Sequence, residues 1–282
     1  MATYNHGVRV LEEATALAVP VSGTAGLQVV IGTAPINLAK NPAAVNEPTI
    51  CSSFLDCEEY LGYSKDFAEY TLCQSMYASF QMFAVAPVVF INVLDPKRHK
   101  KDNAEKQYTV VNKQVTLDEM GVMLETLVVK NDEAVLVSGT DYLATFDADG
   151  KVVLTIIKEG DTVSTVKVTS TSIDPTAVTS TDIIGSYDGE TGAETGIEAV
   201  RKVYPKTGMN MGLLLAPGWS QAPEVAAAMA LKCEKLNGVF YSECLIDLDT
   251  EKAKKYTDCK KVKESSGIED KHQIALWPMV KG

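Results

Sequence analysis

Histidine is scarce in this chain: three of its 282 residues are histidine, and no two of them lie close together in the sequence. A zinc site needs clustered histidine, cysteine and carboxylate ligands, so this scattering argues against a metal. Pairs of the C-x-x-C type are also missing, although the chain has six cysteines: Cys51, Cys57, Cys73, Cys233, Cys244 and Cys259. Because most of these have apolar neighbours, we expect buried free thiols and neither a disulfide framework nor a zinc site.

Long apolar runs are absent as well. No run approaches the roughly 20 residues that a membrane-spanning helix needs. The first residues, MATYNHGVRVLEEA, have neither the basic start nor the apolar core of a secretory signal. We therefore expect a protein that is made and kept in a cytoplasm and that has no membrane partner.

Basic residues are in the minority, with 26 Lys and Arg against 37 Asp and Glu, a formal net charge of −11 and a pI near 4.8. Phosphate binding needs a basic face, so this charge argues against a nucleic-acid partner. One basic cluster, KRHKK at residues 97–101, is short and has no interleaved aromatic residue. We interpret it as a solvated linker between two domains.

Apolar segments of strand length alternate with helix-like segments over much of the chain. The content, 46% hydrophobic and 22% charged, is that of a globular protein, and the length suits about two domains. Strands are predicted at the apolar runs 27–35, 87–96, 212–218, 239–249 and 272–280. Helices are predicted between them, including one over 54–83 and one whose apolar stripe is formed by Val225, Met229, Cys233 and Leu236. Alternation of strand and helix predicts a parallel sheet with crossover helices.

Residues 108–182 have a different pattern, because their segments alternate and are rich in Val and Thr. Asp149-Gly150, between YLATF and KVVLTII, is a strong hairpin signal. We predict an α/β core with a parallel-type sheet, α+β overall, that is split by an inserted antiparallel β domain. The predicted limits are an extended N-terminal arm at 1–20, a discontinuous α/β core at 21–96 and 183–282, and the inserted domain at 97–182.

Glycine-rich phosphate loops are missing too. The turns that follow the strands read IGTAP and APGWS, with one glycine each and prolines in place of the further glycines or the lysine of nucleotide-binding loops. We therefore predict no cofactor.

The best catalytic candidate is Ser220, which lies in GWSQA, one residue short of the G-x-S-x-G nucleophile elbow, between a predicted strand and a predicted helix. A hydrolase would add Asp247 or Asp249 and then His272. His272, however, precedes its strand, so it should lie about 15 Å from Ser220, at the opposite edge of a parallel sheet. We interpret Ser220 as the start of a helix, with Pro223 in the first turn and Glu224 complementing the helix dipole. No catalytic residue is predicted, and the protein is not expected to be an enzyme.

Four blocks of the chain together resemble a known family: YNHGVRVLE near the start, VVIGTAP, the stretch from TGAETGIEAVRKVYP to NGVFYSECLIDLD, and ALWPMVKG at the end. They are similar to the tail sheath protein of contractile bacteriophages and prophages, which also occurs in phage-tail-like bacteriocins and injection machines. The resemblance covers nearly the whole chain and is weakest in the β-rich part.

This resemblance implies a structural subunit of the virion that assembles in the bacterial host cytoplasm. Such subunits form hexameric rings stacked helically around the tail tube, and contraction of the sheath drives tube injection. The implied partners are neighbouring sheath subunits, the tail tube protein, the baseplate and the tail terminator. Family members have a further C-terminal domain, so the resemblance also implies that this chain is a fragment, for which we expect a monomer.

The N-terminal arm is the predicted inter-subunit element, with Tyr4, Gly7, Val8, Val10 and Leu11 as the residues that add a strand to a neighbour's sheet. Two other functions stay open: an outward-displayed adhesion module, suggested by the β domain, and a serine hydrolase that uses Ser220. Assembly into tubes would distinguish a sheath from an adhesin, and Ser220-dependent turnover would reveal a hydrolase.

Overall fold

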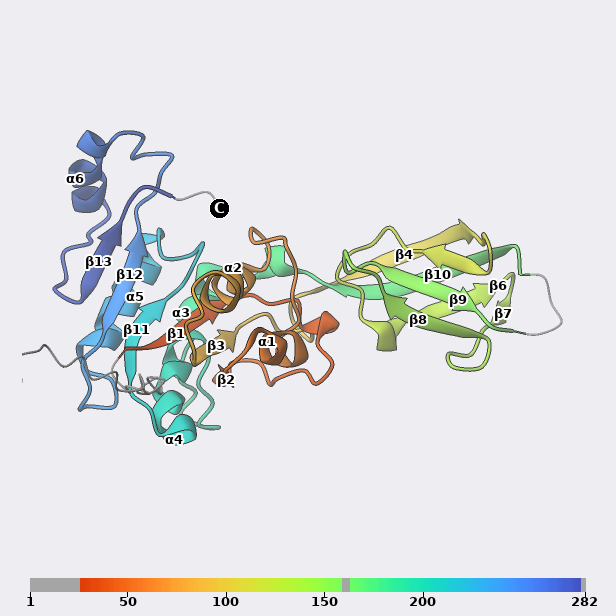
Figure 1. Ribbon diagram of the computed structural model, residues 1–282, viewed down its shortest axis with the longest axis horizontal. Coiled ribbons are helices and arrows are strands. Elements are labelled where there is room, and N and C mark those ends of the chain that lie inside the picture. Colours follow the sequence, from red (N-terminus) through yellow and green to blue (C-terminus); the bar gives the residue numbers. More distant parts are fainter. Residues whose placement is uncertain (1–25, 159–162, 280–282) are drawn as a thin grey trace, which may run out of the picture.

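The computed structural model describes residues 26–158 and 163–279, which form a mixed helical and sheet lobe and an antiparallel β lobe (Figure 1). The chain enters and leaves the β lobe through two paired strands, β4 and β10. The two lobes have separate hydrophobic clusters.

A six-stranded sheet is the centre of the first lobe. Its strands in chain order are β1 (Leu27–Gly32), β2 (Thr49–Cys51), β3 (Val88–Asn92), β11 (Met211–Leu215), β12 (Glu243–Asp247) and β13 (Gln273–Leu276). They are ordered β13-β12-β11-β1-β3-β2. All neighbours are parallel except β2, which runs antiparallel to β3. The predicted parallel sheet is therefore confirmed.

Helices lie on both faces of this sheet. The α-helices are α1 (Phe54–Tyr60), α2 (Thr71–Met76), α3 (Ser180–Ile184), α4 (Val203–Thr207), α5 (Pro223–Glu234) and α6 (Tyr256–Ser265). The other helical turns are η1 (Ile36–Leu38), the π-helical η2 (Tyr77–Met82), η4 (Pro175–Ala177) and η5 (Gly196–Lys202). The elements α3, α5 and η5 contact one another, and α2 packs on β1. The crossovers from β1 and from β11 lead in opposite directions along the sheet. Because such crossovers are right-handed, the α1–α2 segment lies on the opposite face from α5.

The stripe predicted for α5 is confirmed for Val225, Met229 and Cys233, which are buried. Between them these side chains remove most of one helix face from water, which is the main stabilisation of a helix of this length. Leu236 is buried too, but it lies two residues beyond the end of the helix at Glu234.

The single helix predicted over 54–83 is wrong, because α1 and α2 are separated by ten residues of loop and turn. Gly62 has φ +72°, and a Cβ there would lie 2.2 Å from the Pro35 carbonyl oxygen. Beyond it, the Ser64 hydroxyl accepts a hydrogen bond from the Asp66 amide and the Asp66 carboxylate accepts one from the Ala68 amide. These local bonds compete with helix formation.

The β lobe contains two antiparallel sheets. Its strands are β4 (Lys100–Thr109), β5 (Gln114–Thr116), β6 (Val128–Asn131), β7 (Ala134–Val135), β8 (Tyr142–Phe146), β9 (Val152–Ile156) and β10 (Thr165–Ile173), with a 3-10 turn η3 (Leu124–Thr126). The sheets are ordered β4-β10-β6-β7 and β5-β9-β8. The predicted hairpin at Asp149-Gly150 is confirmed, because β8 and β9 pair across it and Gly150 has φ +82°.

Residues 97–101 join the two lobes, and Lys97, Arg98, Lys100 and Lys101 are exposed, as the interpretation as a solvated linker requires, but His99 departs from it. Lys100 and Lys101 begin β4, and the side chain of His99 is buried. Its ring makes local contacts with the backbone and with Asp182 that a charge pattern cannot reveal.

The limits of the inserted domain, 97 and 182, stay a prediction. Residues 100–182, expressed alone, should give a β-rich species with a cooperative thermal transition by circular dichroism, because twelve buried residues between Val115 and Val168 form a cluster of their own. Met123 and Ile173 belong to the other cluster, so a few residues of boundary error are expected. A random-coil spectrum would show that the β lobe needs the first lobe to fold.

Candidate functional site

The carboxyl ends of β1 and β11 form the position at which open α/β sheets hold ligands, because the connections from these two strands lead in opposite directions. Here that crevice is filled by Thr71. A Cβ at Gly32 would lie 2.2 Å from Thr71 Oγ1, and one at Gly218 would lie 3.1 Å from Thr71 Cγ2. The Thr71 amide donates to Thr33 Oγ1 at 3.0 Å, and the Thr33 amide donates to Thr71 Oγ1 at 3.2 Å. Thr71 is thus packed closely against the ends of both strands.

Ser220 lies beside this crevice and is 1% exposed. Its hydroxyl donates to Asp247 Oδ2 at 3.0 Å and accepts from the Asp247 amide at 3.1 Å. Asp249, the other acid considered, instead binds Lys252 in its own turn. The structure thus brings Ser220 and Asp247 together at the carboxyl end of β12.

The predicted place of Ser220 at the start of a helix needs correction. The helix α5 begins at Pro223, with Ala222 as its N-cap, so a turn separates Ser220 from it. The predicted roles of Pro223 and Glu224 in the first turn are confirmed. The side chain of Ser220 ties this turn to β12 and does not cap the helix.

His272 lies at the other end of β12. The Cys244 amide donates to the His272 carbonyl, and Nδ1 of His272 is 3.4 Å from Glu243 Oε1. Its ring stacks on Tyr241 at 6.0 Å between centroids. The prediction that His272 is too distant to act on Ser220 is therefore confirmed by the strand register, in which Glu243 begins β12 and Asp247 ends it. Among residues 26–158 and 163–279 no imidazole contacts Ser220, so its hydroxyl lacks there the general base that serine hydrolases use.

Replacing Ser220 with Ala should remove no hydrolytic activity, because in the part of the chain that the structure describes its hydroxyl contacts the Asp247 carboxylate and no imidazole. It should cost stability of about 1–2 kcal/mol, since the Asp247 amide and carboxylate lose their buried partner. Short-chain chromogenic esters and urea unfolding measure the two effects. Hydrolysis well above buffer that disappears in Ser220→Ala would overturn the assignment.

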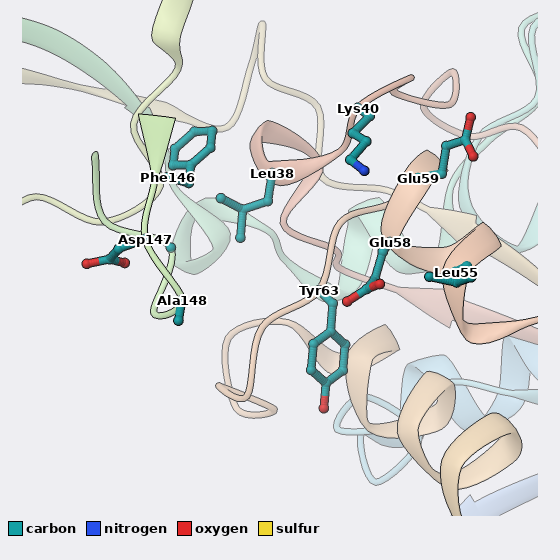
Figure 2. A pocket seen from close by; sticks show the side chains of 10 residues that line it. Leu38, Lys40, Leu55, Glu58, Glu59, Tyr63, Phe146, Asp147 and Ala148 are labelled. Carbon is teal, nitrogen blue, oxygen red and sulfur yellow. The ribbon is translucent and has the colours of Figure 1, made fainter. Parts of the chain in front are cut away.

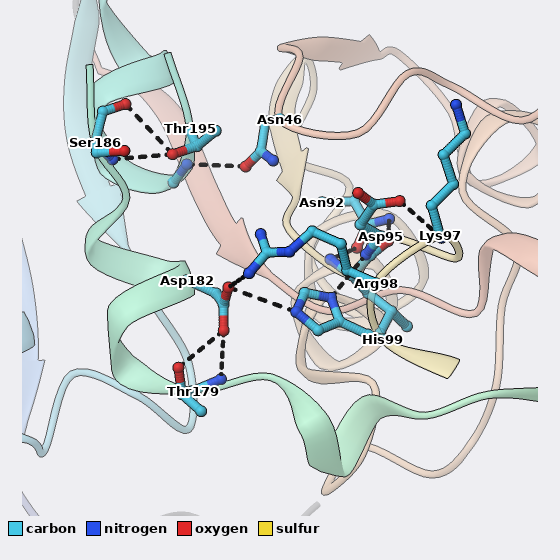
Figure 3. A network of polar contacts seen from close by, with 12 residues as sticks. Asn46, Asn92, Asp95, Lys97, Arg98, His99, Thr179, Asp182, Ser186 and Thr195 are labelled. Carbon is cyan, nitrogen blue, oxygen red and sulfur yellow. Dashed lines mark hydrogen bonds and ion pairs between the residues drawn. The ribbon is translucent and has the colours of Figure 1, made fainter. Parts of the chain in front are cut away.

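A polar network joins the two chain segments that connect the lobes (Figure 3). The Asp95 amide donates to His99 Nδ1 at 3.0 Å, and His99 Nε2 faces Asp182 Oδ1 at 3.5 Å. Arg98 Nη2 donates to the same oxygen at 3.0 Å. Since Nδ1 accepts a hydrogen bond, Nε2 is the ring nitrogen that can donate toward the Asp182 carboxylate. The network holds residues 95–99 against the start of α3.

Asp182 is the anion of this network. Burial opposes its charge, but hydrogen bonds from the Thr179 amide and hydroxyl, together with the nearby His99 and Arg98, hold the pKa of Asp182 below its ordinary value. A lowered folded-state pKa means that the ionised carboxylate stabilises the fold. That contribution is present above about pH 4, near the pKa of an unfolded aspartate, and is lost as the pH falls further.

Asp182→Asn should therefore lower the free energy of unfolding at pH 7 by about 1–3 kcal/mol. The difference from the unsubstituted protein should shrink as the pH falls below about 4, because protonation then removes the same charge. Asp149→Asn, a matched change at an exposed hairpin carboxylate, is the control. Urea midpoints from pH 3 to pH 8 test this, and a difference independent of pH would contradict it.

A groove of about 570 Å³ separates α1 from the β8–β9 hairpin (Figure 2). Its charged lining residues are Lys40, Glu58, Glu59 and Asp147. Glu59 is engaged by Asn41, which donates to it at 2.7 Å. The groove lies where the two lobes face each other and contains no histidine, serine or cysteine nucleophile.

Metal and membrane sites are not found in the described part of the chain. Within residues 26–158 and 163–279, no three His, Cys, Asp or Glu side chains come together as metal ligands. None of the helices described there is long and apolar enough to cross a membrane.

The predicted inter-subunit residues Tyr4, Gly7, Val8, Val10 and Leu11 lie outside the described residues. The described sheet ends at β13, which pairs on one side with β12. Ile274 and Leu276 on this strand are 45% and 42% exposed. An exposed apolar edge strand is a template for pairing with another chain. The sequence pattern predicted a strand here but did not reveal that it forms the edge of the sheet.

Two comparisons with known proteins bear on the resemblance found in the sequence. No family model matches the chain. The chain is 30% identical over 253 residues to the tail sheath protein of the Burkholderia phage BcepMu. The chain is thus similar to a phage tail sheath protein. The resemblance found in the sequence is thereby confirmed.

This relationship to a sheath protein supports a structural role in a phage tail. The alignment covers 87% of this chain and 50% of the relative, so the chain spans about half the length of the sheath protein that it matches.

Proposed function

We propose that this chain is part of a structural subunit of a contractile tail sheath. Subunits would form hexameric rings stacked helically around the tail tube, and contraction would drive tube injection. The observation that carries the proposal is the similarity to a tail sheath protein over 87% of the chain. Thr71, which occupies the usual ligand crevice, supports the further proposal that the protein is not an enzyme.

Its partners would be neighbouring sheath subunits, the tail tube protein, the baseplate and the tail terminator. The subunit would be assembled in the bacterial host cytoplasm and would end in the virion. The net charge of −11 supports the absence of a nucleic-acid partner.

The N-terminal arm would link the subunits. Tyr4, Gly7, Val8, Val10 and Leu11 would add a strand to the sheet of a neighbour, where main-chain hydrogen bonds supply affinity. The exposed edge at β13 supports such pairing, because its outer side has no partner strand in the described sheet. Contraction would then be a rigid-body change between two packings of tethered subunits.

Negative-stain electron microscopy of the protein at its natural length tests this function. We expect tubes or stacked rings of uniform diameter. Particles that never polymerise but bind bacterial surfaces would instead favour the adhesion module, and the sheath proposal would fail.

A further inference from the structure

A basic cleft lies between the η5–α4 segment and the C-terminal end of α5. It consists of two adjoining depressions of about 380 and 350 Å³ that share Arg201 and Asn237. Asn237 Nδ2 donates to the Arg201 carbonyl at 3.1 Å, so the two residues that the depressions share are also bonded to each other. We define the basic cleft by six of its lining residues: Arg201, Lys202, Lys206, Lys232, Lys235 and Asn237.

The cations of this cleft are only partly neutralised. Lys202 and Lys206 share one carboxylate, Glu47, and Arg201 pairs with Glu194 at 3.3 Å. Lys232 pairs with Glu198 at 2.7 Å. In the part of the chain that the structure describes, Lys235 forms no ion pair. Cations therefore outnumber carboxylates here, although the whole chain has a net charge of −11.

Exposed apolar side chains border the cations. Leu231 lines the cleft and is 74% exposed, and Val239 is 67% exposed. Tyr204, at the start of α4, packs on Phe240 with ring centroids 5.3 Å apart. A partner that carries both apolar and acidic side chains would complement this surface, because interfaces combine an apolar centre with a polar rim.

The N-terminal arm starts close to this cleft. Gly26 is packed against β11, since a Cβ at Gly212 would lie 2.6 Å from Gly26 Cα. Lys206 is six residues before Gly212, so it is at most about 20 Å from that point along an extended chain. About six extended residues of the arm would therefore span the distance from Gly26 to the cleft, and the arm has 25 residues before Gly26.

Within the arm, Leu11 is followed by Glu12 and Glu13, and Arg9 is the sole Lys or Arg. This pairing of an apolar residue with two carboxylates is what the basic cleft would accept. We propose that, in the free subunit, residues 11–13 of the chain's own arm occupy the basic cleft. A tethered segment meets its site at millimolar effective concentration, so the intramolecular contact outcompetes the arm of another copy in dilute solution. The inference is independent of tube formation and stands even if the proposed function fails.

Trypsin tests this inference on the whole chain, because cleavage after Arg9 reports how accessible the arm is. We expect Lys235→Glu to raise the initial rate of this cleavage about tenfold, as breaking a close charge contact does. The double substitution Glu12→Gln with Glu13→Gln should do the same without adding a tryptic site. Combining both changes should raise the rate no further, because they remove one shared interaction. Mass spectrometry of the released peptide gives the rate.

The control is Lys260→Glu on α6, which changes the net charge equally at an exposed lysine outside the cleft and should leave the rate unchanged. Equal rates for the Lys235→Glu and Lys260→Glu variants would overturn the inference. The protein concentration is also raised from low micromolar to about 50 times that value. If Arg9 then becomes better protected from trypsin, the inference is overturned, because the arm of a neighbouring copy would be filling the cleft.

Discussion

Sheath tubes should be lost when residues 1–20 are deleted from the protein at its natural length, while the subunit stays folded. The deleted segment has five sizeable apolar side chains: Val8, Val10, Leu11, Leu17 and Val19. Each strand that it adds to a neighbour would contribute several main-chain hydrogen bonds worth about 0.5–1.5 kcal/mol apiece. Because the loss repeats at every lattice contact, assembly should fail outright.

Electron microscopy and circular dichroism measure assembly and folding separately. A finer test replaces Val8 and Val10 with Pro, which removes backbone donors from the added strand. Replacing the same two residues with Thr is the matched control, since Thr keeps the donors and the preference for strands. If the truncated subunit still polymerises normally, lateral contacts between the folded lobes hold the sheath together and strand exchange does not.

Gly185→Ala should destabilise the first lobe by about 3 kcal/mol or more, because a side chain has no space there. Gly185 ends α3 with φ +69°, and a Cβ on it would lie 1.9 Å from the Thr195 carbonyl oxygen. Gly196 meets it from the other side, where a Cβ would lie 2.3 Å from the Ile183 carbonyl oxygen. Both contacts are with backbone, so neither can be relieved by rotating a side chain.

Urea unfolding measures this effect as a lower midpoint at an unchanged m-value. Gly189→Ala is the control, because that glycine lies in the same segment and has nothing within 4 Å of an added Cβ. Equal midpoints for the two variants would show that the close approach of Gly185 and Thr195 is not needed for stability.

The sequence was sufficient to predict those strands and helices in which the spacing of apolar residues reflects which side chains are buried. Leu27 to Gly32 is almost entirely buried, and this near-continuous apolar run predicted β1. Val225, Met229 and Cys233 are buried on α5, so their spacing predicted the buried side of this helix. The pattern failed over 54–83, where aromatic residues indicated one covered helix. The break comes from the close packing of Gly62 on Pro35, a contact between segments far apart in the sequence.

The polar contacts were predictable only in part. Chain order and strand direction were enough to separate Ser220 from His272. They did not reveal that Ser220 binds Asp247, because that bond depends on the turn between β11 and α5. The burial of His99 was missed for a similar reason: its partners Asp95 and Asp182 meet only when the chain returns from the β lobe.

The paired strands β4 and β10 bear on how such a protein can be engineered. Lys100 and Ile173 are opposite each other where the chain crosses between the lobes. Residues paired in this way have Cα atoms about 5 Å apart. A foreign domain whose termini are equally close could replace residues 101–172, provided that it supplies an apolar side chain in place of Met123, which packs in the cluster of the first lobe. Residues 101–172 are thus a natural exchange cassette, and a polymer of such subunits would display one cargo domain per subunit at a regular spacing.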